Sequence, residues 1–104
     1  MMALPDKNSI LKTLAENHQQ LESYGVKQIG LFGSYVRNEA TQNSDIDLLV
    51  DIRKERKTFQ NFMRLNYFLE ELFQNKVELV TLQSLSPYIG PHILKTVEYA
   101  SFPG

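Results

Sequence analysis

The start of the chain carries apolar positions at helical spacing. These positions are Ile10, Leu11, Leu14, His18 and Leu21. Pro5 and Asp6 stand before the pattern and Gly25 stands after it, so we expect one helix between them that covers a face of a sheet. We expect His18 to pack within this helix rather than bind a metal ion, because no second ligand lies near it in the sequence.

Three later segments have the apolar pattern of strands, and helical patterns separate them. The runs at 26–32, 46–52 and 76–82 predict the strands. A short helix is expected from Ser34 to about Ala40, followed by a polar turn at 41–44. A longer helix is expected over 58–74, with Thr58 as its N-cap. Its core-facing stripe is expected to be Phe59, Phe62, Met63, Leu69, Leu72 and Phe73.

The end of the chain predicts one more helical region and a loose tail. Ser86 and Pro87 form a helix start, and Gly90-Pro91 is expected to interrupt that helix. The residues expected to face the core are Ile93, Leu94 and Val97. We expect His92 at the surface and residues 99–104 as a frayed tail. Together these elements predict a single α/β domain over residues 1–104.

Composition narrows the class of protein without naming a chemistry. The chain has 104 residues, 42% hydrophobic and 22% charged, which is typical of one globular domain. The net charge of -1 gives no global basic field for nucleic acid, so no direct nucleic-acid binding is expected. Cysteine is absent, which excludes disulfides and thiolate metal sites. We see no signal peptide in MMALPDKNSI and no long apolar span, so we expect a cytoplasmic protein without a membrane anchor.

Gly33 and Ser34 stand at the corner where the first strand ends and a helix is expected to begin. Such a corner leaves backbone N–H groups unpaired and directed outward, which suits an anion such as phosphate. Gly33 allows a sharp turn and a close approach of the backbone to a ligand. The hydroxyl of Ser34 can donate to a phosphate oxygen.

Two carboxylates follow on the second strand, at Asp45 and Asp47. Alternation along a strand places both on one face, while Ile46, Leu48 and Val50 point into the core. Neighbouring carboxylates repel each other unless a cation lies between them, and oxygen ligands suit Mg²⁺. A phosphate-binding corner close to a magnesium-binding pair predicts a site for a nucleoside triphosphate. Asp51 lies too far along the strand to share one ion with Asp45, and we expect it to be a solvated strand-end residue.

The string Gly33-Ser34, ten residues and then Asp45-x-Asp47 resembles the signature of the DNA polymerase beta-like nucleotidyltransferases. The wider string GSYVRNEATQNSDIDLLV is similar to the minimal nucleotidyltransferases, small proteins that often serve as antitoxins to HEPN ribonuclease toxins. The resemblance covers nearly the whole chain. It implies a short mixed sheet flanked by helices, ATP as the donor substrate and one or two Mg²⁺ ions.

The same resemblance implies a third acidic residue on the strand beside the Asp-x-Asp strand. In the minimal group that strand reads Val-Asp-Leu-Val, and this chain reads Val77-Glu78-Leu79-Val80. Glu78 therefore takes the third position, as a catalytic and metal-binding residue beside Asp45 and Asp47. Its side chain is one methylene longer than that of Asp, and catalytic geometry is sensitive to a shift of this size. The alternative is that Glu78 faces water on an edge strand.

Other residues near the motif have two interpretations each. Arg37 lies one turn after Ser34 and can contact the triphosphate, or it can pair with Glu39 at the surface. Tyr35 can pack against the sheet or line the nucleotide pocket. The charged run at 53–57 is most simply a surface loop, although a basic loop beside an active site can also contact RNA or an acidic partner.

The resemblance implies a reaction and a partner. The chain is expected to transfer AMP from ATP to a hydroxyl, a tyrosine of a HEPN toxin, within a hetero-oligomer. Two alternatives remain open. The chain could be a non-catalytic antitoxin that neutralises the toxin by binding, or a nucleotidyltransferase for a small aminoglycoside-like acceptor.

Overall fold

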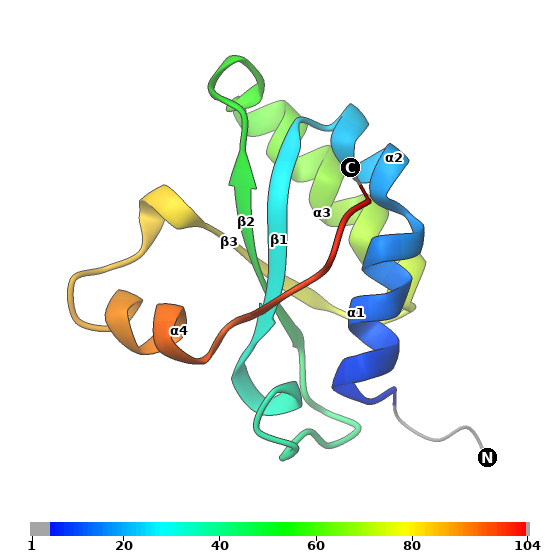
Figure 1. The fold of residues 1–104 in the computed structure, drawn as a ribbon, viewed down its shortest axis with the longest axis vertical. Coiled ribbons are helices and arrows are strands. Elements are labelled where there is room, and N and C mark those ends of the chain that lie inside the picture. Colours follow the sequence, from blue (N-terminus) through cyan, green and yellow to red (C-terminus); the bar gives the residue numbers. More distant parts are fainter. Residues whose placement is uncertain (1–4, 104) are drawn as a thin grey trace.

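A computed structural model describes residues 5–103 of the chain, and its centre is a four-stranded mixed sheet (Figure 1). The strands are β1 (Val26–Phe32), β2 (Ile46–Ile52), β3 (Val77–Thr81) and β4 (Glu98–Tyr99), in the order β3-β2-β1-β4. β1 pairs antiparallel with β2 and with β4, whereas β2 and β3 are parallel. The expected α/β fold with a mixed sheet is thus confirmed. Residues 1–4 and 104 lie outside the described residues. They include the ends of the predicted domain and the start of the segment in which we saw no signal peptide.

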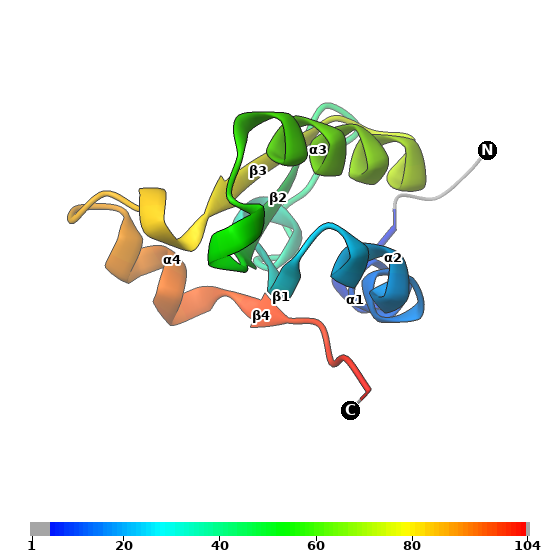
Figure 2. The same cartoon turned by 90° about the horizontal axis from the view of Figure 1, so that it is seen from above.

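Helices cover the two faces of the sheet unequally, as Figure 2 shows from above. The helices are α1 (Lys7–Glu16), α2 (His18–Ser23), α3 (Phe59–Phe73) and α4 (Gly90–Thr96). The first three lie on one side of the sheet and α4 lies on the other. The sheet residues in the main core are Val26, Ile29, Leu31, Ile46, Leu48, Val50, Ile52, Val77 and Leu79. Within residues 5–103, every helix falls short of the length and apolarity that a bilayer crossing requires.

Side-chain N-caps hold two helices that pack on the core, and the cap at Thr58 is the one that the sequence predicted. The Asp6 carboxylate accepts a hydrogen bond of 2.8 Å from the Ser9 amide at the start of α1. The Thr58 hydroxyl accepts one of 3.1 Å from the Asn61 amide at the start of α3. Each bond satisfies an N–H group that has no partner inside its helix, which typically contributes about 1 kcal/mol.

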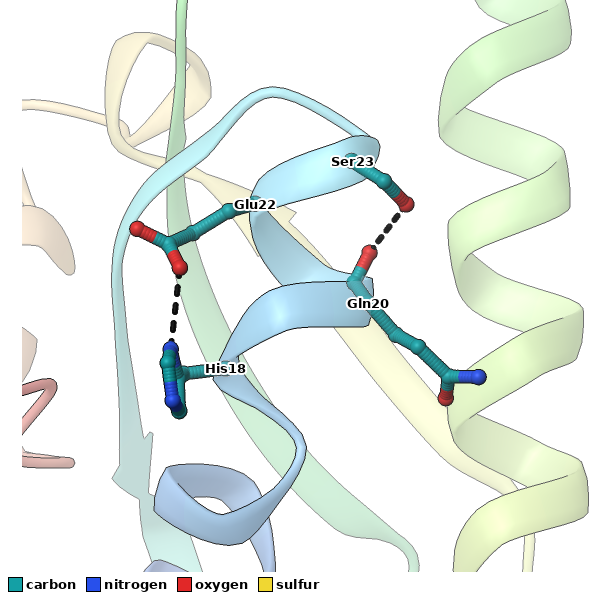
Figure 3. Close-up of polar contacts among 4 residues, drawn as sticks. All are labelled: His18, Gln20, Glu22 and Ser23. Atoms are coloured by element: carbon teal, nitrogen blue, oxygen red, sulfur yellow. Dashed lines mark hydrogen bonds and ion pairs between the residues drawn. The ribbon is translucent and has the colours of Figure 1, made fainter.

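The predicted first helix is wrong in one respect, because the chain forms two helices there. Asn17 leaves the helical conformation between α1 and α2, and its side-chain amide donates to the Thr13 carbonyl. His18 then begins α2, where it lies 2.9 Å from a carboxylate oxygen of Glu22 (Figure 3). The His18 ring also packs against the Phe102 ring. The prediction that His18 is a packing residue is therefore confirmed.

The core-facing stripe of α3 differs from the prediction at its first turn. Phe59, the first residue of the helix, is 79% exposed. Leu69 is fully buried as predicted, Leu65 is fully buried although the predicted stripe left it out, and Phe62, Leu72 and Phe73 pack against the core. The charged segment before α3 is a surface loop as expected: residues 53–57 are exposed and contain the short 3-10 helix Lys54–Arg56.

The C-terminal segment departs most from the sequence-based prediction. Residues 87–89 form a turn, and α4 begins only at Gly90, with Pro91 in its first turn, where a missing N–H costs nothing. Leu94 is 49% exposed rather than buried. The expected tail is instead ordered from Tyr99 through Phe102, because β4 pairs with the outer edge of β1 and Phe102 packs on the core. An edge strand offers unpaired backbone groups, and this short strand satisfies some of them.

Candidate active site

The corner after β1 has the backbone geometry that the Gly-Ser pair predicts. Gly33 has a φ of +78°, a conformation that favours glycine. It begins a 3-10 turn at Gly33–Tyr35, in which its carbonyl accepts from the amides of Val36 and Arg37. The first N–H groups of such a turn have no partner inside it, so the corner can still donate to an anion.

The helix expected from Ser34 to Ala40 is not formed. The 3-10 turn passes into a second turn that ends at Asn38, whose φ is +61°. The Glu39 amide donates to the Ser34 carbonyl over 2.9 Å and closes this loop. A left-handed residue so early stops helix growth. Binding of an anion at the corner must therefore rest on local N–H groups and the Ser34 hydroxyl, without the dipole of a long helix.

Sheet register brings the central residues of the site into one row. Phe32 on β1 lies opposite Asp47 on β2, and Asp47 lies opposite Glu78 on β3. The row belongs to the face of the sheet opposite the main core, since Ile46 and Leu48 on either side of Asp47 are fully buried in that core. The predicted alternation is confirmed for Asp47, whereas Asp45 lies directly before β2 rather than on it. Glu78 is the neighbour of Asp47 on the adjacent strand.

Gly33 and Asp47 touch across the corner. A Cβ atom at Gly33 would clash with Oδ2 of Asp47 and lie 3.0 Å from its Cγ. The glycine thus has two separate reasons to be there, its positive φ and the carboxylate against it. The contact also places the phosphate-binding corner directly beside the carboxylate.

Burial and several neighbouring charges act on the pKa of the Asp47 carboxyl. Burial raises the pKa of its carboxyl from the usual 3.8 to about 6. The carboxylates of Glu78 and Asp45 act in the same direction, and the Arg37 guanidinium opposes them. Desolvation and like charges both disfavour the ionised carboxylate, and a bound cation would reverse both effects.

The donor set at this site fits Mg²⁺ only in part. Carboxylate oxygens such as those of Asp45 and Asp47 are ligands that Mg²⁺ prefers. Within residues 5–103, however, no three His, Cys, Asp or Glu side chains form a ready metal-binding group. An ion bound here would complete its shell with phosphate oxygens and water, as Mg²⁺ usually does. The assignment of Asp45, Asp47 and Glu78 as metal ligands stays a prediction.

The structure decides between the two interpretations of Tyr35 but leaves both interpretations of Arg37 open. Tyr35 is buried at 3% exposure and belongs to the main core, so it packs rather than lines a nucleotide pocket. Arg37 is exposed and its Nε donates to Glu39 over 2.7 Å, yet its charge reaches Asp47. An exposed ion pair of this kind contributes little stability, so a phosphate could displace Glu39. The phosphate contact of Arg37 stays a prediction.

Glu78 and Asp51 mark the edges of the site. Glu78 is exposed on β3, which is an edge strand, so both of its interpretations agree with its position. Asp51 is removed from the site: one carboxylate oxygen lies 3.9 Å from the Lys27 amino group and the other accepts from Gln83. The prediction that Asp51 does not share the ion agrees with these contacts.

A cleft of about 310 Å³ opens beside the row. Most of the residues that line it were not predicted from the sequence. It is lined by Phe32, Glu78, Val80, Ser84, Leu85, Ser86, Ile89 and Ile93. Strand alternation would have placed Val80 on the same face as Glu78. The residues from 84 to 93 gave no such signal, because their place over the sheet depends on the path of the chain after β3.

Ligand-free stability should depend on the charge of Asp47. Because its folded pKa is raised, the folded protein holds this proton more tightly than the unfolded chain, so its stability falls as pH rises from about 4 to about 6. Asp47→Asn removes that penalty. After a discount for partial exposure we expect about 1 kcal/mol of added stability near pH 7.5, or about 4 °C in melting temperature, and none near pH 4.

Thermal unfolding of the two proteins across this pH range checks the expectation. Asp51→Asn is the matched control on the same strand, and it should give no gain at neutral pH because Asp51 lies beside Lys27. An equal gain for Asp47→Asn at both ends of the range would contradict the proposed origin of the effect.

Comparison with known proteins agrees with the fold and the motif. Residues 9–100 match the Nucleotidyltransferase domain family. The chain is 40% identical over 99 residues to the protein adenylyltransferase MntA of Thermococcus cleftensis, covering 95% of this chain and 97% of that protein. A solved structure of a protein proposed to be a minimal nucleotidyltransferase is 27% identical, with a TM-score of 0.78 and coverage of 93% and 98%.

A chain from a crystal structure of a toxin-antitoxin with AMP-PNP is 25% identical, with a TM-score of 0.67. The match covers 95% of this chain and 75% of that one. The resemblance that the Gly-Ser and Asp-x-Asp motifs carried is thereby confirmed. The family match over residues 9–100 agrees with the mixed sheet and with the carboxylates of the site. This chain therefore belongs to the nucleotidyltransferase domain family of enzymes.

Proposed function

We propose that this chain transfers AMP from ATP to a tyrosine hydroxyl of a HEPN-type toxin and so acts as its antitoxin. The observation that carries the proposal is the register of the sheet, in which Asp47 lies between the Gly33 corner and Glu78. A donor phosphate site on one side of Asp47 and a carboxylate on the other side suit a reaction between two substrates. The similarity to a protein adenylyltransferase and to a chain of a toxin-antitoxin structure supports this choice of acceptor.

The residues of the site have separate roles in the transfer. The N–H groups of the Gly33 corner and the Ser34 hydroxyl hold the β- and γ-phosphates, and Arg37 leaves Glu39 to assist them. Asp45 and Asp47, with Glu78 beside them, would hold Mg²⁺, which when bound neutralises triphosphate charge and lowers the pKa of a nearby hydroxyl. Positioning and charge neutralisation supply most of the rate enhancement in such reactions.

Glu78 has the role of proton acceptor in this scheme. The acceptor oxygen attacks the α-phosphorus, a new P–O bond forms, and the bond to the bridging oxygen breaks as pyrophosphate leaves. The hydroxyl proton passes to the Glu78 carboxylate, which is exposed and lines the cleft described above. Transfer to a toxin tyrosine would add a negative charge and bulk beside the residues that cleave RNA.

Intact-mass analysis of the partner tests the proposal. The chain is incubated with ATP, Mg²⁺ and a HEPN-type protein from the same genome, and that protein should gain the mass of one or more AMP units. Loss of toxin activity without any gain in mass would instead support a non-catalytic antitoxin. Transfer of label from ATP to small hydroxylated acceptors, and not to the partner, would support the small-molecule enzyme.

A further inference from the structure

Exposed apolar side chains gather in the segment that forms one wall of the cleft. Tyr88 is 91% exposed, Ile89 is 61% exposed and Leu94 is 49% exposed. All three come from the turn at 87–89 and from α4, which follows it directly. Figure 1 shows this segment projecting to one side of the sheet, away from α1. Ile89 lines the cleft, and Leu94 lines a separate hollow with Pro91, His92 and Lys95. Large exposed apolar side chains concentrated in one short segment mark an interaction surface more often than chance exposure.

The turn that presents these side chains is held in place by hydrogen bonds. The Ser86 hydroxyl accepts from the Ile89 amide over 3.0 Å, and the Ser86 carbonyl accepts from the Gly90 amide over 2.8 Å. Ile93, one turn further on, is buried and its amide donates to the Ile89 carbonyl. The exposed side chains are therefore mounted on an ordered support, which lowers the entropic cost of binding a partner.

The same segment is continuous with the catalytic cleft. Ile89 and Ile93 line the cleft together with Glu78, so the apolar surface begins where the cleft wall ends. An acceptor tyrosine that reaches Glu78 brings its own protein over this rim. A protein acceptor, unlike a small molecule, must cover part of the rim to place its hydroxyl in the cleft.

We propose that Tyr88, Ile89 and Leu94 form the docking surface for the acceptor protein, which meets them with an apolar patch beside its acceptor tyrosine. The inference rests on the proposed function for the identity of the partner. Tyr88 and Leu94 act only in docking, because neither lines the catalytic cleft. Aromatic and aliphatic anchors of this kind carry most of the affinity in protein interfaces.

The double variant Tyr88→Ser, Leu94→Ser tests the docking surface. Calorimetry without ATP measures its Kd for the HEPN-type protein used in the AMP-transfer assay, and we expect at least about tenfold weaker binding than wild type. The KM for that protein in AMP transfer should rise by a similar factor while kcat and the affinity for ATP stay unchanged. Tyr88→Glu alone is a second variant, at a side chain too exposed for its loss to disturb the core.

The double variant Phe59→Ser, Tyr67→Ser is the matched control, because both residues are exposed aromatics on α3 across the sheet. It should bind the partner as wild type does. Wild-type affinity in the Tyr88 variants overturns the inference, as does a wild-type chain that fails to bind the partner. A change only in self-association also overturns it, since the surface would then join two copies of this chain. If wild type binds without transferring AMP, the proposed function fails while the Kd values still decide the inference.

Discussion

The double variant Asp45→Asn, Asp47→Asn is expected to fold and to lose AMP transfer by at least about a thousandfold. Asparagine keeps the shape of each side chain but removes the two negative charges that would hold Mg²⁺ against the triphosphate. Without that charge the corner at Gly33 has only N–H groups and one hydroxyl for the phosphates. The fold should survive because Asp47 is a net electrostatic burden in the ligand-free protein, as its raised pKa indicates.

Intact-mass kinetics with the HEPN partner measure this loss, and thermal unfolding verifies that the variant is folded. Asp51→Asn is the control, because Asp51 lies on the same strand but contacts Lys27 and Gln83 instead of the row. It should transfer AMP at the wild-type rate. Wild-type transfer by the double variant would remove Asp45 and Asp47 from the proposed mechanism.

The sequence predicted the centre of the site well because local rules determine it. Period-two alternation predicted that Asp47 lies on the face of the sheet opposite to that of the buried Ile46 and Leu48, and the structure has this arrangement. Gly33 followed an apolar strand, and a positive φ is what such a corner needs. The pairing of Asp47 with Glu78 came from resemblance, since no local pattern determines which strands become neighbours.

Errors of prediction concentrate where tertiary contacts override local preference. The residues after Ser34 have ordinary helical composition, yet Asn38 adopts a left-handed conformation and the chain turns back after one 3-10 turn. Tyr99 looked like part of a loose end, but the open edge of β1 gave it backbone partners. Leu94 looked like a core residue from its spacing, and its exposure instead suggested the docking surface.

Gly33→Ala is expected to reduce kcat/KM for AMP transfer by at least about a hundredfold in a protein that still folds. An alanine at a φ of +78° costs about 1–2 kcal/mol in backbone strain. Its methyl group would also clash with Oδ2 of Asp47, so the carboxylate must rotate away from the row. The variant thus moves the metal-binding oxygen and narrows the space for the phosphates at once.

Gly25→Ala separates the loss of activity from the backbone strain. Gly25 also has a positive φ, +83°, and a Cβ there would meet the Arg56 side chain at 2.6 Å. The collision lies at the opposite end of β1 from Phe32 and Gly33. We expect Gly25→Ala to lower the melting temperature as Gly33→Ala does but to keep wild-type kcat/KM per folded molecule. If the two variants lose activity equally, strain alone explains the effect of Gly33→Ala. A loss confined to Gly33→Ala means that transfer requires the close approach of the backbone to Asp47.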